Sequence, residues 1–280
     1  MNIEKDTIVE GRHGKPVVID TYFPESIENG SILIFGHGFK GFKDWGHWDL
    51  IARAFVNAGF IFLKFNFSHN GTTPDQLTDF ADLEAFGQNN YSKELADLDV
   101  VLNWVDKQDW ANNKNIGLIG HSRGGGIGII KSANDLRIKA FAAWASVNAL
   151  DYFWKGNQPL IDEWREKGVQ YVYNGRTKQN MPLYFQLYED QQSHAEYLSI
   201  KKALKKRSDL DLLIVHGTAD PAVPAAAAQQ LHQWYPSSVL HLIEGADHVF
   251  GGSHPYKKDQ LPNHSQELVT KSIQFFRNVL

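Results

Sequence analysis

Residues 116–126 read IGLIGHSRGGG, and this stretch decides how the chain folds. The apolar residues 116–119 predict a buried strand, and residues 126–133 have helical potential. Between them, residues 120–124 match the pattern G-x-S-x-G. A serine at the apex of a sharp strand-to-helix turn, with glycines on either side because a Cβ there would clash, is typical of a nucleophile elbow. The alternative is a glycine-rich turn that binds an anion at the helix N-terminus.

Further strands and helices alternate on both sides of this turn. Continuous apolar runs indicate strands that are buried on both faces of a mostly parallel sheet. Residues 11–14 are expected to form a hairpin turn before the first of these strands. The predicted strands are 15–24, 31–35, 60–67, 115–119, 138–145, 210–215 and 239–243, and the predicted helices are 48–58, 92–105, 124–132, 224–234 and 265–279. This alternation predicts an α/β fold built on an open, doubly wound sheet.

Residues 151–208 interrupt the alternation. They contain ten aromatic side chains and no buried-strand run, and their basic end at 201–207 is interpreted as a solvated helix face. We therefore predict a helical cap insertion at 151–208, between core segments 1–150 and 209–280. An insertion at this point lies above the carboxyl ends of the strands. We expect it to cover the functional site. Most of its aromatic side chains are expected to form its own small core, and two or three to give the site an apolar, partly aromatic wall.

A serine nucleophile needs a base, and the base needs an orienting carboxylate. Asp220 and His248 each follow a predicted strand of the second half of the chain. Because the carboxyl ends of parallel strands meet at one edge of a sheet, we expect Ser122, Asp220 and His248 to lie together. Asp247 is the rival carboxylate, although adjacent residues usually point apart. Three other histidines flank glycine turns and are interpreted as packing or hydrogen-bonding residues: His37, His121 and His216.

Acyl transfer also needs hydrogen-bond donors for the developing oxyanion. The backbone N–H of Arg123, directly after the serine, is one candidate. The second is the N–H of Phe39 in the loop HGFKG that follows strand 31–35, where Gly38 and Gly41 allow the loop to fold back. An ordinary tight turn is the alternative interpretation of this loop.

Composition excludes several kinds of protein. The 28 basic and 32 acidic residues among 280 give a net charge of −4, which disfavours nucleic acid or an anionic membrane as the main partner. The absence of cysteine excludes disulfides, thiolate zinc sites and a cysteine nucleophile. The start, MNIEKDTIVEG, lacks the basic and apolar regions of a signal peptide, and no apolar run approaches the roughly 18 residues of a membrane span. We expect a soluble, cytoplasmic protein.

Four stretches together resemble the α/β-hydrolase superfamily: HGFKGFKDW, GHSRGGG, HGTADPAVP and GADHVFGG. Within it, the chain is similar to esterases of the cinnamoyl/feruloyl-esterase group, to dienelactone-hydrolase-like enzymes and to the catalytic domains of prolyl-oligopeptidase-type peptidases. The resemblance covers most of the chain and is weakest at 151–208. It implies the α/β-hydrolase fold, a Ser122–Asp220–His248 triad, and an oxyanion hole from Phe39 and Arg123, with no metal or organic cofactor.

The chain departs from these relatives in two places. Residues 68–71 read SHNG where many relatives carry an Arg-Gly-His-Gly-like turn, and Arg123 stands where many esterases have a smaller or uncharged residue. Both departures leave the choice of substrate open. Because the chain has no cysteine nucleophile, we do not expect dienelactone hydrolase activity itself.

The predicted function is a serine hydrolase that cleaves small carboxylic esters, short-acyl or aryl-acyl, through an acyl-enzyme. A small peptidase or amidase is the alternative, and it would need an acidic pocket for a peptide N-terminus. The candidates for that pocket are Glu163, Glu166, Glu189 and Asp190. A non-catalytic binding protein is disfavoured because all three triad residues are present. A metal enzyme that uses His37, His47 and Asp44 is disfavoured because their spacing fits no helical ligand pair. The oligomeric state stays open.

Overall fold

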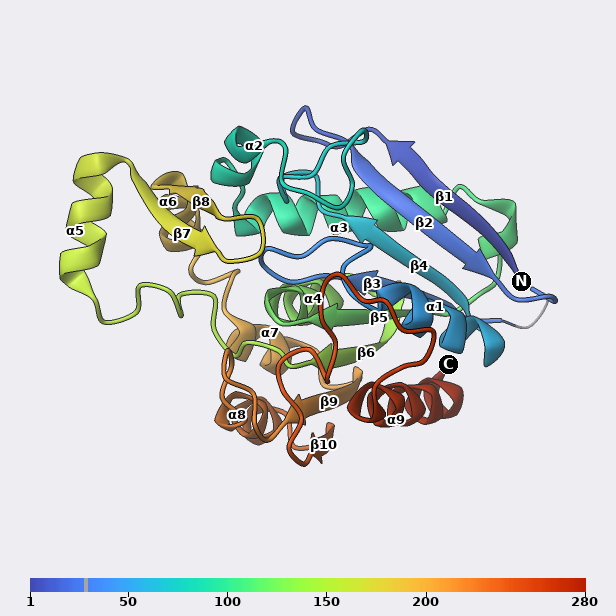
Figure 1. Ribbon diagram of the computed structural model, residues 1–280. Helices are drawn as coiled ribbons and strands as arrows, with labels where there is room; N and C mark the ends of the chain where they lie inside the picture. The colour runs from blue at the N-terminus through green and yellow to red at the C-terminus, as the bar shows by residue number, and fades with distance from the viewer. Residues whose placement is uncertain (28–29) are drawn as a thin grey trace.

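The computed structural model describes residues 1–27 and 30–280, and its central element is an eight-stranded sheet in the order β1-β2-β4-β3-β5-β6-β9-β10 (Figure 1). Strands β1 (Asn2–Val9) and β2 (Val17–Phe23) form an antiparallel edge, and β2 pairs antiparallel with β4. The other pairings are parallel and join β4 (Ile61–Asn66), β3 (Ile32–Gly36), β5 (Ile116–His121), β6 (Ile138–Trp144), β9 (Asp211–Gly217) and β10 (Val239–Ile243). The predicted doubly wound, mostly parallel sheet is confirmed.

Helices cover both faces of this sheet. Side chains alternate along β3, so that Ile32 and Ile34 pack into one hydrophobic cluster, and Leu33 and Phe35 pack into a second cluster on the opposite face. The first cluster includes side chains of α3 (Tyr91–Val105), α4 (Arg123–Asn134) and α8 (Ala226–Trp234), and the second includes side chains of α1 (Trp48–Asn57) and α9 (Asn263–Val279). The central strands are therefore buried on both sides, as their continuous apolar runs predict.

The predicted strands and helices of the sheet layers are all present, and their ends differ from the predicted ones by at most two residues. Outside residues 151–208, three of the described elements were not predicted. They are strand β1, the short helix α2 (Leu83–Gly87) and the 3-10 helix η1 (Asp109–Ala111). Among the helices that the structure describes, none is long and apolar enough to cross a membrane.

Residues 151–208 form elements outside the main sheet, drawn in yellow to orange in Figure 1. These elements are α5 (Gln158–Lys167), the antiparallel hairpin β7 (Val169–Asn174)–β8 (Gln179–Tyr184), α6 (Gln186–Ser193) and α7 (Ile200–Lys206). The hairpin adds strands to the helices that the sequence predicted. Helix α7 packs on α4, α6 on α3, and β8 on α2. The segment thus packs against the helices α2, α3 and α4 of the core. That it forms a cap separate from the core stays a prediction.

Candidate active site

Ser122 lies at the turn between β5 and α4, where it has the left-handed backbone angles φ 56° and ψ −120°. A Cβ on Gly120 would lie 2.3 Å from the carbonyl oxygen of Gly124, and a Cβ on Gly124 would lie 2.5 Å from that of His37. Only glycine fits at these two positions. A serine outside the usual backbone regions costs on the order of 1–3 kcal/mol and persists only where its surroundings impose it. This geometry favours the nucleophile elbow over a simple anion-binding turn.

The loop after β9 presents Asp220 to His248. Asp220 Oδ2 lies 2.7 Å from Nδ1 of His248, and Oδ1 accepts the N–H groups of Ala222 and Val223 at 2.8 and 2.9 Å. The carboxylate is fully buried. Burial by itself would raise the pKa of Asp220, but hydrogen bonds from His216, His248 and the backbone of Val223 outweigh it and hold this pKa below its usual range. An ionised Asp220 therefore keeps the proton of His248 on Nδ1.

Asp247, the rival carboxylate, turns back into its own loop. Its Oδ1 accepts the N–H of Val249 at 3.2 Å and that of Gly251 at 2.8 Å. In the described part of the chain, Asp220 is the carboxylate that bonds the His248 ring.

His121 supports the backbone of His248. Its Nε2 lies 2.8 Å from the carbonyl oxygen of His248, and the two rings are 4.8 Å apart. Burial, and then the neighbouring His248, lower the pKa of His121 to about 3. The neutral ring donates its Nε2–H to that carbonyl, as the packing interpretation of this residue expects.

Ser122 and His248 both line two cavities that adjoin at the elbow. One has a volume of about 560 Å³ and is called the apolar cavity; the other has a volume of about 280 Å³ and is called the cationic cavity. The apolar cavity is lined by Phe39, Lys40, Ser122, Val147, Asn148, Tyr152, Ala222, Val223, Pro224, Ala226, Ala227, Gln230 and His248. The cationic cavity is lined by His37, Gly38, Phe39, Lys40, Gly41, Trp45, Trp48, His121, Ser122, Asn174, Arg176, His248, Val249 and His254. A molecule bound at Ser122 thus has room on two sides.

The loop that carries Phe39 lies directly against the elbow. A Cβ on Gly38 would lie 2.8 Å from Ser122 Cβ and 3.0 Å from the carbonyl oxygen of His121. The loop folds back as predicted, because the N–H of Gly41 donates to the carbonyl oxygen of Gly38 at 3.0 Å. On the other side of Ser122, the N–H of Arg123 belongs to the first turn of α4, where backbone donors have no partner within the helix.

The side chain of Arg123 packs against Phe39 and residues of α3. It is buried, and its guanidinium lies 4.1 Å from the centre of the Phe39 ring and 5.4 Å from that of Tyr91. It also donates to the hydroxyl of Tyr152 at 3.3 Å and lies 3.5 Å from a carboxylate oxygen of Glu94. This unusual elbow residue therefore packs under the Phe39 loop and lines neither cavity.

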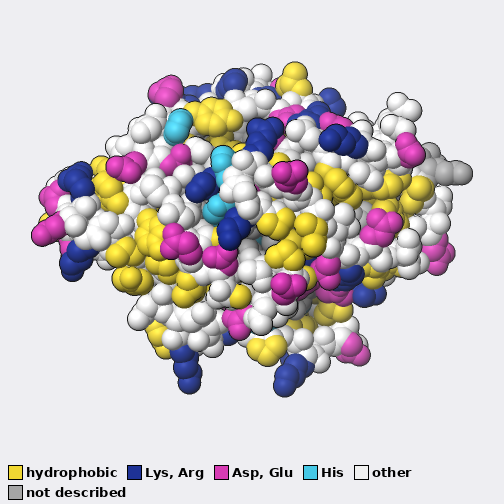
Figure 2. All heavy atoms as spheres, turned by 90° about the horizontal axis from the view of Figure 1, so that it is seen from above, with side chains coloured by type: hydrophobic (Ala, Val, Ile, Leu, Met, Phe, Trp, Pro, Cys, Tyr) yellow, Lys and Arg dark blue, Asp and Glu magenta, His cyan; other side chains and the backbone are white. Residues whose placement is uncertain are grey.

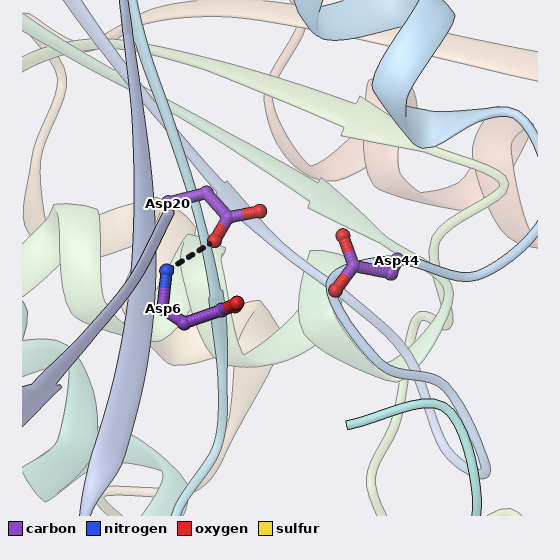
Figure 3. Close-up of side chains that lie close together, drawn as sticks. All are labelled: Asp6, Asp20 and Asp44. Atoms are coloured by element: carbon purple, nitrogen blue, oxygen red, sulfur yellow. Dashed lines mark hydrogen bonds between the residues drawn. The ribbon is translucent and has the colours of Figure 1, made fainter. Parts of the chain in front are cut away.

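Three carboxylates converge beside the antiparallel edge of the sheet, at a place where a metal ion would be considered (Figure 3). The space between Asp6, Asp20 and Asp44 is taken by the ammonium of Lys43, at 2.7, 2.8 and 2.6 Å from their oxygens. Lys64 also pairs with Asp20, at 3.2 Å, and with Asp44. Both lysine side chains are buried. The chain supplies its own cation here, and the donor set does not fit an additional metal ion.

The residues of the disfavoured alternatives lie apart from the site or from one another. His47 Nε2 lies 2.7 Å from the Ser265 hydroxyl, while Asp44 pairs with lysines, so His37, His47 and Asp44 form no ligand set. The four acidic residues proposed for a peptide N-terminus, Glu163, Glu166, Glu189 and Asp190, line neither cavity.

The cavity walls differ from those expected. Of the ten aromatic side chains at 151–208, only Tyr152 lines either cavity. Several of the others pack against one another: Phe153, Trp154, Trp164, Phe185 and Tyr188. The apolar wall comes chiefly from the small side chains that follow β6 and β9. Lys40, Asn174 and Arg176 also line the cationic cavity, and nothing in their local sequence predicts this.

Comparison with known proteins agrees with this architecture. The profile of the Alpha/beta hydrolase family matches residues 33–258. Est1E from Butyrivibrio proteoclasticus, solved with ferulic acid bound, is 18% identical, with a TM-score of 0.72 over 97% of this chain and 98% of its own. The alpha/beta hydrolase GrgF from a Penicillium species is 16% identical, with a TM-score of 0.75 over 100% and 99%. A dienelactone hydrolase from Anabaena variabilis is 13% identical, with a TM-score of 0.62 over 100% and 98%.

These identities establish the fold alone. A sequence relative, the uncharacterized 31.7 kDa protein of the traX-finO intergenic region of Escherichia coli, is 26% identical over 136 residues. The match spans 49% of this chain and 44% of that relative, less than half the relative's length. Because the family profile covers most of the chain, the predicted α/β-hydrolase resemblance is confirmed, and the chain belongs to the alpha/beta hydrolase family.

Proposed function

We propose that this chain is a serine hydrolase that cleaves small carboxylic esters. The observation that carries the proposal is the 2.7 Å contact between His248 Nδ1 and buried Asp220, in a histidine that lines the same two cavities as Ser122. A strained serine, an ionised carboxylate and an imidazole, in this order along the chain, form the set that acyl transfer requires.

In the proposed reaction, Ser122 Oγ attacks the ester carbonyl carbon and His248 Nε2 accepts its proton. The N–H groups of Phe39 and Arg123 donate to the oxyanion of the tetrahedral intermediate. When the intermediate collapses, the alcohol leaves with the proton from His248, and Ser122 is acylated. Water then attacks the acyl-enzyme by the same route and releases the carboxylic acid. Asp220 holds the histidine in the tautomer that both steps need.

The apolar cavity supports short-acyl or aryl-acyl esters as substrates. Its volume of about 560 Å³ is within the range of small-molecule sites, and its walls include small apolar side chains such as Val147, Pro224 and Ala227. Est1E, which shares the fold, has been solved with the aryl acid ferulic acid bound. The proposed partner is a small-molecule ester in the cytoplasm. The amidase alternative gains no support, because no acidic residue lines either cavity.

The test combines a fluorophosphonate probe with an ester panel. The wild-type protein should be labelled by the probe, and Ser122→Ala should lose both labelling and turnover while keeping its circular dichroism spectrum. Ser253→Ala is the matched control, since that serine is exposed on a nearby loop. Labelling of Ser122→Ala at the wild-type level would contradict the assignment of the nucleophile.

The panel runs from acetyl to palmitoyl esters and adds a hydroxycinnamate ester and aminoacyl amides. We expect the highest kcat/KM for a short acyl group or for the hydroxycinnamate. A maximum at palmitoyl, or turnover of the amides only, would move the protein to a lipase or a peptidase.

A further inference from the structure

The two cavities at Ser122 differ in chemistry. Six of the thirteen residues that line the apolar cavity have small aliphatic side chains, whereas Arg176 lines the cationic cavity alone. Lys40 lines both cavities, and no carboxylate lines either of them. Both cavities share Phe39, Lys40, Ser122 and His248. An ester with its carbonyl group at Ser122 would therefore extend one substituent into each environment.

Arg176 reaches the cationic cavity from the turn between β7 and β8. Its guanidinium lies over the rings of Phe42 and Phe80, at 5.5 and 5.6 Å from their centres. Its nearest acidic neighbour is Asp79, at 3.5 Å, on a side chain that is 55% exposed. An exposed pair at this distance contributes little, and the planar guanidinium keeps donors for a second anion.

Lys40 reaches the same cavity from the loop that carries Phe39. Its Nζ makes a long contact of 3.4 Å with the carbonyl oxygen of Tyr173, and it forms no ion pair within residues 1–27 and 30–280. Burial lowers the pKa of Lys40 from its usual value, because no nearby carboxylate compensates for the lost water. An anion bound beside this ammonium would stabilise its charged form.

Three of the four histidines that line the cationic cavity are uncharged at neutral pH. Burial lowers the pKa of His37 to about 4 and that of His121 to about 3, and it also lowers the pKa of His254. Lys40 and Arg176 therefore bring to the cavity the positive charge that these three histidines do not. On the face shown in Figure 2, Lys or Arg side chains lie beside histidines near the middle, while acidic side chains are spread over the whole face.

We propose that the substrate is an ester bearing a carboxylate, which binds between Lys40 and Arg176 while a short apolar or aryl group fills the apolar cavity. This inference rests on the proposed esterase function and narrows it to anionic esters. Charge-assisted hydrogen bonds to a carboxylate favour it over a methyl group of similar size by about tenfold or more.

The experiment compares matched ester pairs that differ in one carboxylate. For the acyl side, the pair is para-nitrophenyl hemiglutarate and para-nitrophenyl valerate. For the alcohol side, it is meta-acetoxybenzoate and meta-tolyl acetate. We expect kcat/KM to favour the anionic member of one pair by about tenfold or more, and the preferred pair identifies which side of the ester enters the cationic cavity. Salt should reduce the preference by screening the charges.

The variants test the two cations separately. Arg176→Gln and Lys40→Met should each lower the ratio of kcat/KM for the anionic over the neutral ester by about tenfold, and Arg176→Lys should retain part of it. The control is Arg165→Gln, which removes an arginine that also lies over an aromatic ring but lines neither cavity. It should leave the ratio unchanged.

The outcomes separate this inference from the function on which it rests. Turnover of neutral esters without any preference for a carboxylate, or a ratio that survives both cavity variants, would overturn the anionic-substrate inference alone. Failure to label Ser122 and to hydrolyse any ester would overturn the proposed function itself.

Discussion

The substitution Gly38→Ala, which adds one methyl group beside Ser122, should lower the catalytic rate without unfolding the protein. An alanine Cβ would lie 2.8 Å from Ser122 Cβ, whereas ordinary contacts begin near 3.4 Å, so the loop must retreat by about 0.6 Å. The elbow cannot yield, because the N–H of Ser122 is bonded to the carbonyl oxygen of Trp144 at 2.9 Å. The N–H of Phe39 moves with the loop. Since misplacement of about 1 Å can cost about 10²-fold, and loss of one oxyanion donor about 10²–10³-fold, we expect kcat for Gly38→Ala to fall about 10²-fold.

The assay is steady-state hydrolysis of an acetyl ester, with thermal unfolding followed in parallel. KM should change little, because the displaced donor acts on the oxyanion and not on the bound ester. Gly175→Ala is the matched control, since a Cβ at Gly175 meets no atom within 4 Å. If Gly38→Ala is folded and its kcat stays within a few fold of the wild type, the loop does not supply an oxyanion donor.

Three further predictions concern buried charges. Asp220→Asn should lower kcat by about 10⁴-fold through loss of the histidine tautomer, and Asp247→Asn far less; reversed effects would exchange their roles. Lys43→Met should lower the free energy of unfolding in urea by about 3–5 kcal/mol, and Lys5→Met, whose lysine is 41% exposed, by less than about 1 kcal/mol; equal losses would refute the buried-cation interpretation. Burial raises the pKa of Asp97 to about 7, so the folded state binds more protons than the unfolded state between about pH 4 and 7, and stability falls as pH rises through that window. In Asp97→Asn this pH dependence should disappear, so that between about pH 4 and 7 its free energy of unfolding should gain up to about 4 kcal/mol relative to the wild type, measured by urea titration. A difference between the two proteins that does not change with pH would contradict this prediction.

The sheet was predictable because its signals are local. Strands such as β3 and β5 are buried on both faces, so nearly every side chain in them is apolar. The turn at Ser122 was predictable for a similar reason. A Cβ at position 120 or 124 would lie less than 3 Å from backbone atoms, so both positions need glycine, and the two glycines are visible in the sequence. In contrast, β7 is half-exposed and mixes polar with aromatic residues, so its sequence does not distinguish a strand from a loop.

The walls of the site could not be predicted for a different reason. Lys40 and Arg176 are 136 positions apart and meet only because the β7–β8 turn lies beside the Phe39 loop. Lys40 stands in the HGFKG loop, but nothing in that stretch indicates that it faces Arg176, and Arg176 belongs to no motif. The position of the Arg123 side chain could not be predicted either. The residue follows the proposed nucleophile in the sequence, but nothing in the sequence indicates that its side chain is buried against Phe39.

The ammonium of Lys43 among three carboxylates has a practical consequence. A protein that neutralises such a cluster with calcium or magnesium depends on the supply of that ion and loses stability to a chelator. Here the counter-charge is tethered to the backbone by four methylene groups, so it cannot dissociate, and its effective concentration does not depend on the medium. The loop that begins at the carboxyl end of β3 is thereby fastened to the antiparallel edge of the sheet by a cation that no dialysis removes.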